Sequence, residues 1–89
     1  MNTLEIAADR KFRVECMGGN LFAFRKDSAT HHALVTLNDF DGGINGSPDD
    51  EWMITIYRNE DNEEIMGACG GLTLEDALAG ASADLETLA

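Results

Sequence analysis

Two short segments of the chain carry more than half of its acidic side chains. The first is a glycine-rich stretch at 38–51, and the second surrounds a polar turn at 59–62. Carboxylates crowded onto loops and turns attract hard cations or complementary positive surfaces. The candidate partner-binding residues are therefore Asp39, Asp41, Asp49, Asp50, Glu51, Glu60, Asp61, Glu63 and Glu64.

The first stretch does not match a calcium-binding loop. An EF-hand loop needs acidic ligands in its first half, a glycine at its sixth position and a glutamate at its twelfth. In a frame that starts at Asp39, Ile44 stands at the glycine position, and in one that starts at Asp41, Trp52 replaces the glutamate. We therefore expect a solvated acidic loop and no metal site.

The other residues able to do chemistry form no catalytic pattern. His31 and His32 are adjacent, and adjacent residues on a strand point to opposite faces, so the pair is badly placed to share a metal. No CxxC pair occurs, and no serine stands in a nucleophile-elbow motif. The sequence predicts no catalytic residue, no cofactor and no enzyme activity. Cys16 and Cys69 are predicted to be buried thiols on strands, or a disulfide bridge if those strands are neighbours.

The charge of the chain is strongly acidic and unevenly distributed. Six Lys and Arg stand against 17 Asp and Glu, for a formal net charge of −11. Residues 1–30 hold five basic and four acidic residues, whereas residues 31–89 hold one basic and thirteen acidic residues. Such an excess repels phosphates, so we expect neither direct nucleic-acid binding nor binding to anionic membranes. No stretch approaches the roughly 18 apolar residues of a membrane span, and the N-terminus lacks the basic region of a signal peptide. We therefore expect a cytoplasmic location.

The chain reads as several strands followed by one helix. Strands are predicted at 11–16, 21–25, 32–37, 52–58 and 64–69, where apolar or β-branched residues recur. Gly18 and Gly19 predict a tight hairpin turn with positive φ angles. Residues 1–9 are ambiguous, because Leu4, Ile6 and Ala8 alternate as in a strand while Thr3 could cap a short helix.

The final helix is well marked and sets the fold class. Thr73 is the predicted N-cap, with Asp76 three residues later. One face carries the apolar residues Leu74, Ala77, Leu78, Ala81, Leu85 and Leu88. The sequence therefore predicts a single α+β domain over residues 1–89, with an antiparallel sheet of about five strands and a C-terminal helix packed on one face.

One helix cannot cover both faces of such a sheet. The aromatic and methionine residues of the strands, namely Phe22, Phe24, Met53 and Tyr57, therefore cannot all belong to the core. Either some of them form an open face that contacts another chain, or the 38–51 loop or the N-terminal segment folds over them.

Two resemblances bear on function. In size, charge and strand-rich α+β build, the chain resembles the small acidic inhibitors encoded by phages and mobile elements, among them anti-CRISPR proteins and other DNA mimics. That class shares no motif, so this resemblance assigns no residues. Separately, residues 65–78 resemble the strand-into-helix step of the HicB-type antitoxin domain, in which a similar T-x-E-E-A run opens the helix.

These observations lead to one functional expectation and two alternatives. We expect a non-enzymatic acidic protein that binds a basic nucleic-acid-binding protein or complex and inhibits it, in the host cytoplasm if phage-encoded. The alternative is a HicB-like antitoxin or small regulatory domain that forms a homodimer through an open sheet face around Phe22, Phe24 and Tyr57. The third interpretation is that the carboxylates serve solubility alone.

Overall fold

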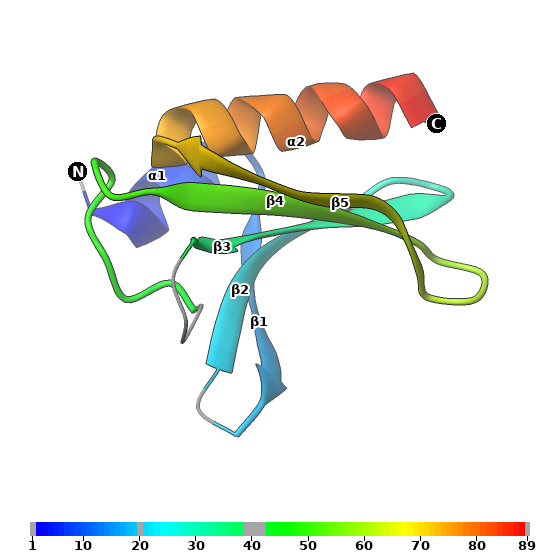
Figure 1. Ribbon diagram of the computed structural model, residues 1–89, viewed down its shortest axis with the longest axis horizontal. Helices are drawn as coiled ribbons and strands as arrows, with labels where there is room; N and C mark the ends of the chain where they lie inside the picture. The colour runs from blue at the N-terminus through cyan, green and yellow to red at the C-terminus, as the bar shows by residue number, and fades with distance from the viewer. Residues whose placement is uncertain (1, 20, 39–42, 89) are drawn as a thin grey trace.

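Five strands form one antiparallel sheet in which every strand pairs with its neighbour in sequence, in the order β1-β2-β3-β4-β5 (Figure 1). The computed structural model describes residues 2–19, 21–38 and 43–88, and only the backbone of residues 67–69. The strands are β1 (Arg13–Gly18), β2 (Leu21–Asp27), β3 (His31–Leu37), β4 (Trp52–Arg58) and β5 (Glu63–Leu72), and the helices are α1 (Thr3–Asp9) and α2 (Leu74–Leu88). The predicted α+β fold, an antiparallel sheet with a C-terminal helix, is confirmed.

Helix α2 begins where the sequence predicts and covers one face of the sheet. The Thr73 hydroxyl accepts a hydrogen bond from the Asp76 N–H at 3.2 Å, which satisfies one of the unpaired amides of the first turn. Of the predicted apolar stripe, Leu88 is half-buried and the other five side chains are buried. They pack on β3 and β4 (Figure 1). A Cβ at Gly80 would lie 3.2 Å from Ile54 Cδ1, so this glycine permits a close approach of helix and sheet.

The core lies between α2 and the sheet and is closed at one side by α1. Trp52 and Phe24 are fully buried, and their rings stack with centroids 5.9 Å apart. Ile6 and Ala7 of α1 join this core. The strand alternative for the N-terminal segment is therefore wrong. The helix is capped by Asn2 rather than Thr3.

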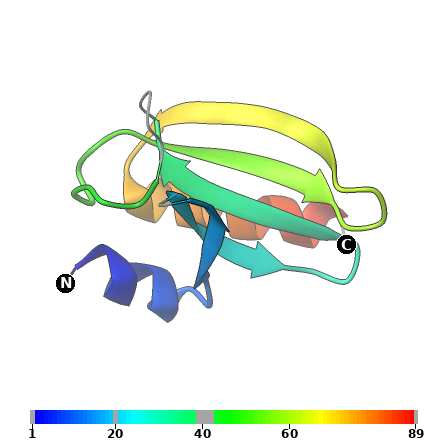
Figure 2. The same ribbon diagram turned by 90° about the horizontal axis from the view of Figure 1, so that it is seen from below.

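The β1–β2 hairpin projects away from the two-layer body, on the side opposite α2 (Figure 1). Gly18 and Gly19 have φ angles of +112° and +58°, as predicted for its turn. Strand β1 begins two residues later than predicted, because Lys11 has a φ of +68° and interrupts the extended backbone. Figure 2 looks onto the sheet from the face that α2 leaves uncovered.

Two predictions about individual side chains are wrong. Cys16 is an exposed free thiol, and the strands of Cys16 and Cys69, β1 and β5, form opposite edges of the sheet, so the two cysteines are not neighbours. Phe22, Phe24 and Tyr57 do not share an open face. Phe24 is in the core under α2, whereas Tyr57 lies on the other face, half-buried and stacked on His32.

Candidate functional site

Nine of the fifteen Asp and Glu residues that the structure describes gather at two places, which we call the loop end and the turn end. The loop end comprises Asp49, Asp50 and Glu51 together with Glu75 and Asp76 from the first turn of α2. The turn end comprises Glu60, Asp61, Glu63 and Glu64 around the β4–β5 turn. Asp39 and Asp41, the other two candidate residues, lie outside the described residues.

The loop end is held by two hydrogen bonds from the loop to the rest of the fold and by one within the loop. The Trp52 indole Nε1–H donates to the Ser47 carbonyl at 2.9 Å, which ties the loop to the core. The Leu74 N–H donates to the Pro48 carbonyl at 3.0 Å, which brings the loop beside the start of α2. The Asp50 carboxylate accepts the Ser47 N–H at 2.7 Å, so Asp50 shapes the loop as well as adding charge.

Helix α2 therefore adds two carboxylates that the sequence predicted only as helix-stabilising. Glu75 and Asp76 favour the positive end of the helix dipole. The Leu74–Pro48 hydrogen bond places them next to the acidic loop, and no sequence pattern signals that contact. Arg10 offsets part of this charge through a 3.0 Å ion pair with Glu75. The loop end thus presents five carboxylates against one paired arginine.

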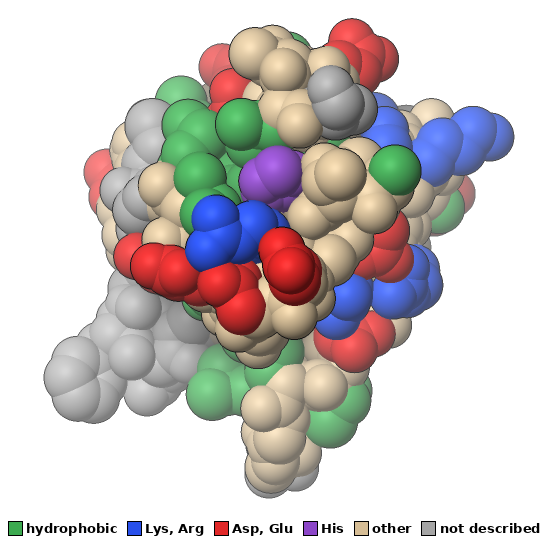
Figure 3. Space-filling model, turned by 90° about the vertical axis from the view of Figure 1, so that its right-hand side faces the viewer, with side chains coloured by type: hydrophobic (Ala, Val, Ile, Leu, Met, Phe, Trp, Pro, Cys, Tyr) green, Lys and Arg blue, Asp and Glu red, His purple; other side chains and the backbone are tan. Residues whose placement is uncertain are grey.

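The turn end is organised by Arg58, the last residue of β4. Its guanidinium donates to both carboxylate oxygens of Asp61, at 3.0 and 2.6 Å, and to Glu63 at 2.9 Å. The hydrogen bonds from Arg58 outweigh desolvation and, with the charge of Arg58 and backbone hydrogen bonds, lower the pKa of Asp61 to about 2. Arg58 therefore pairs with Asp61 and Glu63, two of the four carboxylates at this end. Figure 3 faces this end of the molecule and shows Asp and Glu side chains bordering Lys and Arg side chains beside a histidine.

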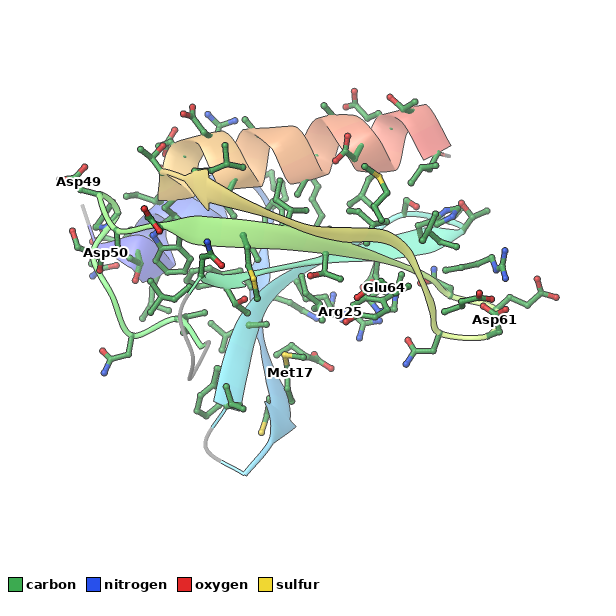
Figure 4. All side chains as sticks on the ribbon, viewed as in Figure 1. Met17, Arg25, Asp49, Asp50, Asp61 and Glu64 are labelled. Atoms are coloured by element: carbon green, nitrogen blue, oxygen red, sulfur yellow. The ribbon has the colours of Figure 1, made fainter. Side chains whose placement is uncertain are left out.

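The two ends lie far apart, at opposite ends of the long axis of the molecule. Figure 4 shows Asp49 and Asp50 at one end and Asp61 at the other. Strand β4 runs between them, and its seven residues span about 20 Å. The seven predicted residues that the structure describes therefore do not make one continuous surface.

Most of the arginine charge is neutralised within the fold. On the uncovered face, Arg13 and Arg25 both bind Asp27, at 2.7 and 3.0 Å, and both approach Glu15. Partial burial raises the pKa of Asp27, but its hydrogen bonds and ion pairs with the two arginines outweigh burial and lower it. These four side chains form a closed, neutral network. The net negative charge of the chain therefore comes mainly from residues outside this network.

A cavity of about 510 Å³ opens at the turn end, between Thr30, His31, Arg58, Glu60 and Leu88. His31 bonds Thr30 Oγ1 at 2.7 Å, whereas His32 is buried and bonds Asn59 Oδ1 at 2.7 Å. The two histidines therefore have separate partners, in accord with their predicted opposite orientations. The part of the chain that the structure describes brings no three His, Cys, Asp or Glu side chains together in a way that could hold a metal ion.

No protein-family model, curated protein or solved structure matches this chain. Among residues 2–19, 21–38 and 43–88, no helix is both long enough and apolar enough to cross a membrane. The features that bear on function are therefore the two acidic ends, the neutral network between them and the projecting hairpin.

Proposed function

We propose that this chain is a non-enzymatic binding protein that docks its acidic ends on a basic nucleic-acid-handling protein or complex and inhibits it, in the manner of anti-CRISPR proteins and other DNA mimics. The observation that carries the proposal is the segregation of charge. Carboxylates stand at both ends of the molecule, whereas Arg13 and Arg25 are held in a neutral network between them. The site of action is the cytoplasm, that of the host cell if a phage encodes the protein.

The density of charge supports a comparison with nucleic acid. A net charge of −11 over a longest dimension of 31 Å is one charge per about 2.8 Å. Duplex DNA carries about one charge per 1.7 Å of axis and each of its strands about one per 3.4 Å. The linear charge density of this protein therefore lies between those of a single strand and a duplex. A channel that attracts DNA would attract this protein by the same long-range field.

Inhibition follows if this protein and the nucleic acid compete for the basic channel of the partner. A basic surface occupied by the acidic ends is closed to phosphates, because both ligands need the same lysines and arginines. The effect is strongest at low ionic strength and weakens as salt screens the charges, with a Debye length of about 8 Å at physiological ionic strength. Steep salt dependence is thus a signature of this function.

The test begins with capture of partners from a cell lysate at low and at high salt. A captured nucleic-acid-binding protein is then purified, and its affinity for the chain is measured by calorimetry across a salt series, with and without competing duplex DNA. We expect the affinity to fall steeply with salt and the DNA to displace the chain. An interaction indifferent to both salt and DNA refutes the proposal.

Charge reversals then separate the two ends from the charge of the whole chain. The loop-end variant is Asp49→Lys with Glu51→Lys, which leaves Asp50 in place to hold the loop. The turn-end variant is Glu60→Lys with Glu64→Lys, which leaves the Arg58 cluster intact. The matched control is Asp9→Lys with Glu86→Lys, two exposed residues that belong to neither group of carboxylates.

All three double variants change the net charge by the same amount. We expect an affinity loss of about tenfold or more at low salt for a variant of an end that contacts the partner. The control should lose much less, through the long-range field alone. Equal losses in all three variants would show that only net charge matters and that neither end is a docking site.

A further inference from the structure

The β1–β2 hairpin exposes four large apolar side chains. Val14, Met17, Leu21 and Phe22 are each between 40 and 50% exposed. Figure 4 shows Met17 below the body of the molecule, on the projecting part of the hairpin. Of the large apolar side chains exposed to this extent within the described ranges, more than half are therefore on one hairpin.

The fold itself does not cover these side chains. Helix α2 packs on β3 and β4, and the hairpin extends away from it (Figure 1). Phe22 pairs with Cys16 across the hairpin, and Leu21 points to the opposite face because successive strand residues alternate. Both faces of the hairpin are therefore apolar, and a single layer packed on one face would leave the other exposed.

The outer part of the hairpin is also free of charged residues. Residues 16–24 contain no charged residue, in a chain in which 26% of residues are charged. At its base, Arg13, Glu15, Arg25 and Asp27 form the closed neutral network. Natural sheet edges are normally protected from self-association by charges, prolines or bulges. The outer half of β1 has one bulge and no charge.

The other edge of the same sheet provides the contrast. Strand β5 begins with Glu63 and Glu64, and its pairing with β4 is irregular at three places. Both features discourage the pairing of another strand. The two edges of one sheet therefore differ, and the one in the near-neutral N-terminal third of the chain is the less protected.

We propose that two copies of this chain associate around a two-fold axis by pairing the edges of their β1 strands, so that the apolar side chains on both faces of each hairpin, Val14, Met17, Leu21 and Phe22, are partly covered by the other copy. A two-fold contact places the same patch on both sides, and an apolar patch is complementary to itself. The neutral hairpin lets two copies meet while the carboxylates of both ends stay outside the contact. A basic partner, by contrast, is attracted to those ends. A second copy therefore fits this surface, because it supplies an identical uncharged and unprotected edge.

Sedimentation equilibrium across a protein concentration series tests the proposal, in reducing buffer so that the Cys16 thiol cannot form a covalent dimer. We expect a reversible dimer whose dissociation constant falls as salt is raised, because salt screens the repulsion between two copies of charge −11. Binding through the acidic ends has the opposite salt dependence. Failure of either proposal is therefore distinguishable from failure of the other.

Two matched double variants locate the contact. Met17→Ser with Phe22→Ser should weaken dimerisation by more than about tenfold, through loss of apolar burial on both copies. Ile65→Ser with Met66→Ser changes two side chains that are 38 and 40% exposed on β5, and should leave it unchanged. Because all four positions are exposed, circular dichroism should show the native fold in both variants.

Each contrary result overturns the proposal. A wild-type chain that remains monomeric at the highest concentration, at both low and high salt, excludes the dimer. A dimer that survives the hairpin variant, or is lost in the β5 variant, places the contact elsewhere.

Discussion

Trp52 connects the acidic loop to the core. Replacing it with phenylalanine should lower the stability of the fold and weaken the attachment of the loop. Its indole is fully buried, stacks on Phe24 with ring centroids 5.9 Å apart, and donates to the Ser47 carbonyl at 2.9 Å. Phenylalanine keeps the stacked ring but removes the donor and part of the volume. Trp52→Phe is therefore a test of whether this one side chain holds the loop end in place.

The expected cost has two parts. Loss of the hydrogen bond costs about 1 kcal/mol, toward the low end of the range because Ser47 is exposed and its carbonyl can bind water instead. Loss of buried indole atoms, with the small cavity they leave, costs about 1–2 kcal/mol more. The total of about 2–3 kcal/mol is a large fraction of the roughly 4–13 kcal/mol expected for a domain of this size. At about 4–8 °C per kcal/mol, Tm should fall by roughly 10–20 °C.

Thermal unfolding followed by far-ultraviolet circular dichroism measures this change without relying on the fluorescence of the replaced tryptophan. The control is Tyr57→Phe, which keeps the ring stacked on His32 and should shift Tm little. Hydrogen exchange should also speed up at the Ser47 and Asn38 amides, which donate to Asp50 and to the Glu51 carbonyl. A Tm loss below about 4 °C, or unchanged exchange in the loop, would refute the role given to Trp52.

Three further outcomes are expected. Asn2→Ala removes the capping box of α1 and should cost about 1 kcal/mol, measured by urea unfolding. Arg58→Gln should raise the pKa of Asp61 from about 2 toward its ordinary value, measured by NMR titration of the carboxyl carbon. Because the folded pKa of Asp61 is depressed, its contribution to stability is complete above about pH 4–5 and is lost as pH falls toward 2, and the variant should lack that loss. Gly46→Ala would place a Cβ 2.6 Å from Leu37 Cδ2, so it should lower Tm and shift the amide resonances of the loop, and an unchanged spectrum would contradict this packing.

The strands and the final helix were predictable because local patterns and tertiary structure agree there. The alternation from Trp52 to Arg58 and the cap at Thr73 each determine an element on their own, and both were placed correctly. The N-terminal segment was ambiguous because three alternating apolar residues suit a strand as well as a short helix. The Asn2–Glu5 capping box decides for the helix, with N–H···O distances of 2.9 and 3.3 Å.

The grouping of acidic residues was only partly predictable, because it depends on which segments the fold brings together. The length of β4 already implied that its two flanking acidic segments lie at opposite ends of the sheet, provided that the strand is straight. The addition of Glu75 and Asp76 to the loop end rests on one backbone hydrogen bond between Leu74 and Pro48. Hydrophobic periodicity carries no information about such a contact. The exposure of Phe22 beside the buried Phe24 is likewise set by how far α2 reaches across the sheet.

The separation of the two acidic ends has a physical consequence for binding. At about 20 Å they are more than two Debye lengths apart at physiological ionic strength, so each end interacts with its surroundings almost independently. The molecule then resembles a bivalent ligand, whose second contact forms at the high effective concentration that the first one provides. A rigid strand such as β4 fixes the spacing, and this favours a partner whose basic sites have the same spacing over one with the same total charge. Partner selection by the ends would thus depend on geometry as well as on charge, while the neutral hairpin remains available for a second copy.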